Sequence, residues 1–255
     1  MYNVFLLFIF IIEFSFNLTN DKKNLLISAI TKYSWDIIKL YYISMIKADF
    51  ENVDVVVYYG NITQEAINKL NSFGIITYPI PEEYLNSTIN ILPQYRFKLY
   101  ELYLKENKDK YNMVFTADVR DTIFQKDVFK FYNYSKPFLG IFLEEKTLRQ
   151  EINRGWILQF IDQKEYNSGI ADKRIICSGS LMGTVDKFME FCTVLWDTVK
   201  NRSVSLDQGA TNYLIYSKKL FDGYLVITDN HGPVMTIGDS VRSNIKLYNN
   251  DTILN

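Results

Sequence analysis

The stretch NMVFTADVRD, residues 112–121, contains the pattern that decides the fold of this 255-residue chain. Its first five residues form a short apolar run, as expected of a strand that is buried on both faces. The run passes directly into a segment that holds Asp118 and Asp121. Ligands of open α/β sheets gather at the carboxyl ends of the strands, so this pattern directs attention to the two carboxylates.

Strand-like and helix-like segments alternate on either side of this stretch. Apolar runs predict strands at residues 24–30, 53–59, 75–78, 112–116, 137–143, 174–177 and 224–228. Segments of helical length lie between or beside them, at residues 34–50, 63–72, 94–107, 148–161, 185–199 and 208–216. No repeat or Pro/Gly linker interrupts the chain. We therefore expect a single α/β domain with a mostly parallel central sheet flanked by helices.

Composition excludes several classes of function. The 28 basic residues nearly balance the 29 acidic ones and form no dense cluster, which argues against nucleic acid as a partner. A Ser-His-Asp hydrolase is excluded because the sequence has no G-x-S-x-G elbow. A zinc site is poorly supplied by two cysteines and one histidine.

The N-terminus differs from the rest of the chain. Residues 4–12, VFLLFIFII, are too short to span a bilayer easily but fit the apolar core of a signal peptide. We assign residues 1–17 to a signal peptide and residues 18–255 to the domain, so no stable transmembrane helix is expected after processing. An uncleaved anchor or a buried strand are the alternatives.

Other features agree with entry into the lumen of the secretory pathway or with secretion. Six N-x-S/T sequons occur, at Asn17, Asn61, Asn86, Asn133, Asn201 and Asn250. Cys177 and Cys192 are the only cysteines. In an oxidising compartment they either pair or remain as two buried thiols, and the sequence leaves both possibilities open.

The spacing of Asp118 and Asp121 has two interpretations. Two carboxylates three positions apart, at the end of a strand, could hold a hard divalent ion together with a diphosphate. Such an ion would neutralise the charge that accumulates on a diphosphate leaving group. Alternatively, Asp118 caps the next segment and Asp121 pairs with Arg120 in a turn.

Three segments together resemble the GT-A-fold glycosyltransferases, which have a single Rossmann-like domain. They are residues 112–129 (NMVFTADVRDTIFQKDVF), 176–184 (ICSGSLMGT) and 207–209 (DQG). The first looks most like an acidic D-x-R-D-x-x-F-Q block that stands in place of a plain DxD motif. The resemblance implies sugar transfer from a nucleoside-diphosphate sugar to a glycan or glycoprotein acceptor. It also implies Mn²⁺ or Mg²⁺ on the diphosphate.

The resemblance implies a role for each of several residues. Asp118 and Asp121 would be the metal ligands, and His231, the only histidine, is a candidate third ligand. Arg96 would reach the donor or brace the acidic loop, although a solvated helix face is the alternative. Arg120 would brace a carboxylate or contact phosphate.

Two further segments would form the donor-sugar pocket and the reaction centre. Ser178, Gly179 and Ser180 would wall the pocket, because small residues let a sugar approach the backbone; the alternative is a tight turn. Asp207 and Gln208 would face the reaction centre as the catalytic pair. Asp207 would also suit the N-cap of a helix.

Two other functions remain possible on this reasoning, because a fold-level resemblance does not establish a reaction. One is a catalytically degenerate relative that binds sugar nucleotides or glycans without turnover. The other is a different α/β nucleotide-binding protein. In similar enzymes a C-terminal tail often supplies a histidine, and His231 stands alone here. We therefore expect donor binding with slow transfer or loss of the sugar to hydrolysis.

Overall fold

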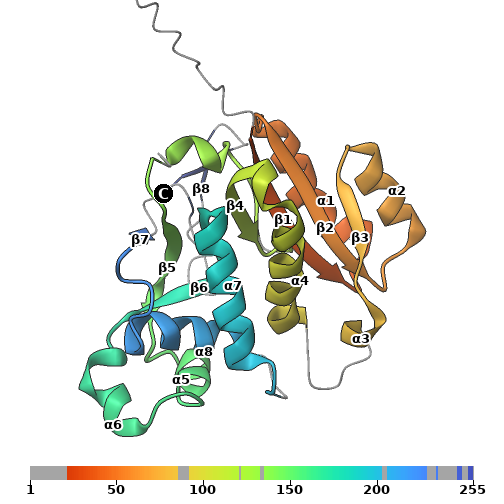
Figure 1. Cartoon of the computed structure of the whole chain (residues 1–255). Helices are drawn as coiled ribbons and strands as arrows, with labels where there is room; N and C mark the ends of the chain where they lie inside the picture. The colour runs from red at the N-terminus through yellow and green to blue at the C-terminus, as the bar shows by residue number, and fades with distance from the viewer. Residues whose placement is uncertain are drawn as a thin grey trace, which may run out of the picture.

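The computed structural model describes residues 22–85, 92–120, 122–132, 135–202, 206–228, 234, 246–248 and 252–254. A seven-stranded sheet with the order β3-β2-β1-β4-β6-β5-β7 forms its centre (Figure 1). Its strands are β1 (Lys23–Thr31), β2 (Val53–Gly60), β3 (Ile76–Pro79), β4 (Tyr111–Ala117), β5 (Leu139–Thr147), β6 (Arg174–Thr184) and β7 (Leu225–Thr228). Two further strands, β8 (Lys246–Tyr248) and β9 (Thr252–Leu254), pair only with each other.

The sheet is mostly parallel, as the alternation of segments predicts. Strands β3, β2, β1 and β4 are parallel to one another, and β7 is parallel to β5. Strand β6 is antiparallel to both of its neighbours, β4 and β5. It is therefore the one strand of the described sheet that runs against the others.

Helices cover both faces of the sheet. They are α1 (Trp35–Lys47), α2 (Gln64–Ser72), α3 (Glu82–Leu85), α4 (Leu92–Asn107), α5 (Glu151–Ile157), α6 (Gln163–Glu165), α7 (Val185–Val199) and α8 (Asp207–Asn212). Short 3₁₀ turns occupy Lys108–Lys110 and Val128–Phe131, and π turns occupy Tyr166–Ile170 and Tyr213–Ser217. Among the described residues, no helix combines the length and apolar character that crossing a bilayer requires.

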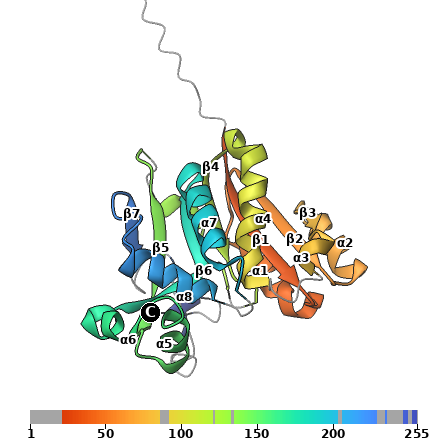
Figure 2. The ribbon, with the colours of Figure 1, turned by 60° about the horizontal axis from the view of Figure 1, so that its bottom comes forward.

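Consecutive residues of the central strands enter two separate cores. Leu25 of β1 belongs to the core beneath α4 and α7, whereas Leu26 belongs to the core beneath α1. Figures 1 and 2 show α4 and α7 side by side on the first of these faces, with α5, α6 and α8 beside β5 and β6. Burial on both faces explains why these strands are continuously apolar rather than alternating.

Local sequence signals mark the ends of several elements. Thr63 precedes α2, and its hydroxyl accepts a hydrogen bond from the Ala66 amide at 3.2 Å. Gly74 follows the same helix with a φ of 74°, the left-handed conformation that favours glycine at the C-terminal end of a helix. The predicted helix at residues 148–161 is shorter, since α5 covers only Glu151–Ile157.

Candidate active site at the carboxyl edge of the sheet

Asp118 is the first residue after β4, at the carboxyl edge of the parallel strands. Ala117 pairs with Ser180 of the antiparallel strand β6, which brings Gly179 against the Asp118 side chain. A Cβ atom at position 179 would lie 2.3 Å from Asp118 Oδ2 and 2.7 Å from its Cγ. Glycine at this position therefore lets the carboxylate take its present orientation, in which the Asp118 side chain is 47% exposed.

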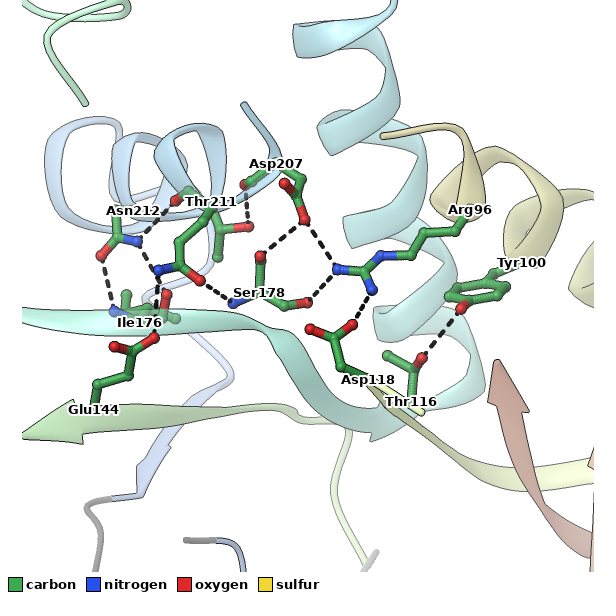
Figure 3. A network of polar contacts seen from close by, with 11 residues as sticks. Arg96, Tyr100, Thr116, Asp118, Glu144, Ile176, Ser178, Asp207, Thr211 and Asn212 are labelled. Atoms are coloured by element: carbon green, nitrogen blue, oxygen red, sulfur yellow. Dashed lines mark hydrogen bonds and ion pairs between the residues drawn. The ribbon is translucent and has the colours of Figure 1, made fainter. Parts of the chain in front are cut away.

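Arg96 of α4 joins this carboxylate to a second one (Figure 3). Its Nη1 donates to Asp118 Oδ1, and its Nη2 donates to Asp207 Oδ2 at 2.9 Å and to the Ser178 carbonyl at 3.3 Å. The side chains of Arg96 and Asp207 are each only 10% exposed. Arg96 is thus not part of a solvated helix face, and its contact with Asp118 braces the start of the acidic segment.

Asp207 is the first residue of α8 rather than its N-cap. Leu206 holds the N-cap position, and its side chain makes no capping hydrogen bond. The Asp207 carboxylate instead accepts hydrogen bonds from Arg96 and, at 2.9 Å, from the Ser178 hydroxyl. The N-cap interpretation of Asp207 is therefore wrong, because its side chain turns into the interior toward a buried cation.

Gln208, the next residue of α8, is fixed by contacts to three other elements. Its Nε2 donates to Asn153 Oδ1 of α5 at 2.8 Å and to Glu144 Oε1 of β5 at 3.3 Å. Its Oε1 accepts from the Ser178 amide of β6 at 3.4 Å. The side-chain amide therefore has both its oxygen and its nitrogen engaged, which sets its orientation.

A second anchor holds α8 to β6. Asn212 Oδ1 accepts from the Ile176 amide at 2.9 Å, and Asn212 Nδ2 donates to the Ile176 carbonyl at 3.1 Å and to the Gln208 carbonyl at 2.8 Å. Figure 3 shows this pair of contacts beside the Arg96 network. The two bonds to Ile176 hold the last residue of α8 against β6, whereas Asp207 and Gln208 hold its first turn through their own contacts.

The segment of small residues lies within a strand. Ser178, Gly179 and Ser180 belong to β6, which continues to Thr184. The tight-turn interpretation of this segment is therefore wrong. Ser178 and Ser180 are both buried, and the Ser178 hydroxyl is engaged by Asp207. The structure thus brings Gly179 beside Asp118 and Ser178 beside Asp207, within one network.

Burial and charge act in opposite directions on the two buried ionic groups. Burial tends to lower the pKa of Arg96, but Asp118 and Asp207 outweigh it and raise the pKa above the usual value. Burial raises the pKa of Asp207 despite the opposing effect of Arg96. Burial also raises the pKa of the Tyr100 hydroxyl, which contacts Thr116 beneath Arg96, to about 12. The network is therefore an ion-paired interior with one half-exposed carboxylate at its edge.

Sequence reasoning did not single out Glu144, Asn153 and Asn212, which hold Gln208 and α8 in place. Glu144 directly follows the apolar run of residues 139–143, so the rule that drew attention to Asp118 applies to it as well. Asn153 and Asn212 carry no such signal, because their contacts depend on how α5 and α8 dock.

The predicted metal ligands fall partly outside the described residues. Asp121 and His231 lie there, and so do the sequons at Asn17, Asn86, Asn133 and Asn250 and the predicted signal peptide of residues 1–17. Arg120 is exposed on the loop after β4. Among the residues that the structure describes, no three His, Cys, Asp or Glu side chains group closely enough to hold a metal ion. Asp118 supplies a half-exposed carboxylate, the oxygen ligand that hard divalent cations prefer.

The two cysteines are free thiols in the structure. Cys192 is buried in the core beneath α4 and α7, and Cys177 lies in β6 next to Ser178. Burial raises the pKa of Cys177 to about 12, and the negative charges of Glu144 and Asp118 act in the same direction. Of the two possibilities that the sequence leaves open, the structure has the unpaired thiols.

Comparison with known proteins shows the fold. No protein-family model matches the chain, and no curated protein sequence matches it either. A crystal structure of an active-site mutant of LgtC is similar, with a TM-score of 0.50 and 17% sequence identity, over 81% of this chain and 73% of that one. A structure of the galactosyltransferase LgtC with donor and acceptor sugar analogues is also similar, with a TM-score of 0.47, 16% identity and the same coverage of both chains. The chain therefore has the GT-A fold that the resemblance implies.

Proposed function

We propose that this protein is a glycosyltransferase that moves a sugar from a nucleoside-diphosphate sugar to a glycan or glycoprotein acceptor. One observation carries the proposal. Within a GT-A fold, an acidic residue at the carboxyl end of β4 is joined through a buried arginine to an Asp-Gln pair at the start of α8. Buried ionic clusters at the ligand-binding edge of an α/β sheet are where perturbed functional groups concentrate.

In this proposal one end of the network would bind the diphosphate of the donor and the other end would bind its sugar. At the exposed end, Asp118 would face the diphosphate of the donor, with Asp121, Arg120 and His231 as the further candidates from the sequence. At the buried end, Asp207, Gln208 and the segment Ser178–Ser180 would line the donor sugar. Arg96 carries one positive charge and pairs with two carboxylates, so the three groups together keep a net charge of −1.

A divalent cation, Mn²⁺ or Mg²⁺, would neutralise the negative charge that develops on the departing diphosphate. Asp118 fits such a group, because its carboxylate is half-exposed and its Oδ2 is not the oxygen that Arg96 binds. Fixed donors such as Arg96 and the oriented Gln208 amide contribute by being in place before the sugar moves, which lowers reorganisation during transfer.

We also propose that the protein works in the lumen of the secretory pathway or outside the cell. The support is the apolar run of residues 4–12 and the six sequons. Asn61 and Asn201, the two sequon asparagines among the described residues, are both exposed. A shift in gel mobility after glycosidase treatment of the cell-expressed protein would test this.

The experiment that tests the activity is a panel of nucleoside-diphosphate sugars incubated with the protein in the presence of Mn²⁺. We expect release of the nucleoside diphosphate from one donor, abolished by chelation of the metal. Asp118→Asn should lower the turnover at least about 100-fold, the scale of losing one electrostatic group in an active site. Asp186→Asn is the matched control, an exposed carboxylate at the start of α7 on the opposite edge of the sheet.

A second candidate is a binding module without turnover, and a specific observation favours it. Arg96 already neutralises Asp118, and the described residues contain no three-ligand group for a metal. Calorimetry separates the two functions. Binding of one nucleotide sugar with no release of nucleoside diphosphate would favour the module, whereas no binding of any donor would contradict both.

A further inference from the structure

Helix α1 is apolar on its outer face as well as its inner face. Its inner side chains, Ile38, Tyr41, Tyr42 and Met45, are buried against the sheet. Its outer side carries four large apolar side chains that are 38% to 54% exposed, namely Ile37, Leu40, Ile43 and Ile46. A helix that is apolar all round is normally covered on all sides. The outer face of α1 thus leaves uncovered the kind of contiguous apolar area that marks interaction sites on proteins.

The centre of this outer face has the spacing of a coiled-coil seam. Asp36, Leu40, Ile43 and Lys47 follow one another at intervals of four, three and four residues, so they form one line along the helix. Leu40 is 54% exposed and Ile43 is 38% exposed. The line is therefore acidic at the start of α1, apolar in the middle and basic at the end.

This line is complementary to itself when turned end for end. In an antiparallel pair of α1 helices whose two-fold axis passes between positions 41 and 42, Leu40 faces Ile43 of the other copy. Asp36 then faces Lys47 of the other copy, and the two-fold axis produces two such pairs. Ile37 and Ile46, which flank the line on either side, exchange places under the same rotation. A two-fold interface requires this kind of self-complementary surface.

The charges of this surface favour a second copy over a lipid surface. Asp36 is 81% exposed and pairs with Lys39 of its own helix, whereas Lys47 makes no ion pair with any other described residue. Asp36 and Lys39 offset each other, which leaves Lys47 as a single positive charge rather than the basic cluster that anionic lipids would require. Antiparallel helices also bring the positive end of one helix dipole beside the negative end of the other.

The area of the surface sets the expected affinity. A helix of 13 residues is about 20 Å long and covers less than the roughly 800 Å² per partner of a standard interface. A groove beside the end of α1, lined by Ile46, Phe50, Phe73 and Ile76, widens the apolar area on one flank. We propose that the protein forms a two-fold homodimer through antiparallel packing of α1, with a dissociation constant in the micromolar range.

A charge swap tests the proposal and its register. Sedimentation velocity between about 1 and 100 µM should show a concentration-dependent dimer. Leu40→Glu should weaken the dimer more than about 100-fold, because it places two carboxylates in the apolar middle of the seam. Asp36→Lys and Lys47→Asp should each weaken it about 10-fold, and the double variant Asp36→Lys/Lys47→Asp should recover most of the loss.

Two controls keep the result interpretable. Leu220→Glu changes another apolar side chain that is 50% exposed but lies outside α1, and it should leave the dimer unchanged. Thermal unfolding of every variant shows whether it is folded. A protein that stays monomeric at about 100 µM would overturn the proposal. So would a double swap weaker than either single change, or vesicle binding that Leu40→Glu abolishes in a monomeric protein.

Discussion

Replacing Arg96 with methionine leaves a buried carboxylate without its cation. The side chains of Arg96 and Asp207 are each 10% exposed, and their ion pair spans 2.9 Å. Removing one partner of such a pair costs about 3–5 kcal/mol, because the remaining charge is buried alone. Asp118 is 47% exposed, so the loss of its partner adds only about 0–1 kcal/mol. We expect the free energy of unfolding of Arg96→Met to fall by about 3–5 kcal/mol at pH 7.5.

The loss should depend on pH with a definite sign. Burial already raises the pKa of Asp207 in the folded protein, and the charge of Arg96 is the largest of the effects that oppose this rise, ahead of the hydrogen bonds from Ser178 and Gln208. Without the guanidinium the folded pKa of Asp207 rises further. A carboxyl whose pKa is raised on folding stabilises the fold at low pH and loses that contribution as the pH rises through its folded pKa. The deficit of Arg96→Met should therefore shrink when the pH falls from 7.5 toward 5.

Urea unfolding followed by circular dichroism measures this deficit, and a constant slope shows that both proteins unfold to similar states. The double variant Arg96→Met/Asp207→Asn is the control, because it removes the stranded charge together with its partner. It should recover most of the stability lost by Arg96→Met at pH 7.5. A deficit below about 1 kcal/mol, or one that is the same at both pH values, would refute the account of a buried ion pair.

Two glycine substitutions are expected to act differently, because one new methyl group meets backbone atoms and the other meets a side chain that can move. Gly209→Ala places its Cβ 2.8 Å from backbone atoms of Trp156 in α5, which cannot move aside, so thermal unfolding should show a loss of about 1–3 kcal/mol. An unchanged midpoint would contradict the close packing of α5 on α8. Gly179→Ala instead meets the movable Asp118 side chain, so its stability should stay within about 1 kcal/mol while calorimetry shows weaker binding of Mn²⁺ and donor. If Gly179→Ala bound the cation with wild-type affinity, the position of Asp118 would not determine cation binding.

The alternation of apolar runs was enough to predict most elements of the sheet, because strands buried on both faces must be continuously apolar. It did not predict that β6 is antiparallel or that it continues to Thr184. The segment SGSLMG contains no β-branched residue and resembles a turn in isolation. Its pairing with β4 and β5 decides its structure, and that pairing joins segments far apart in the sequence.

For the candidate site too, the sequence predicted which residues take part but not the long-range contacts between them. Asp118, Arg96 and the Asp207–Gln208 pair were named from their positions at the ends of strands and helices and from the resemblance, and the structure brings them together. Their exact roles within the network, above all the pairing of Arg96 with two carboxylates, depend on distances across 22 and 111 positions of the chain. Periodicity carries no information about such contacts.

The separation of the partners of Arg96 also has a consequence for synthesis on the ribosome. Asp118 leaves the ribosome 22 residues after Arg96, but Asp207 follows only after 111 residues. At about 5–20 residues per second, the guanidinium waits roughly 6–20 seconds for its second carboxylate. During that interval a nascent chain that buried Arg96 would bury a guanidinium with only one of its two carboxylate partners. Closure of this interior is therefore coupled to the arrival of α8, which makes the last helix of the site a checkpoint for completing the fold.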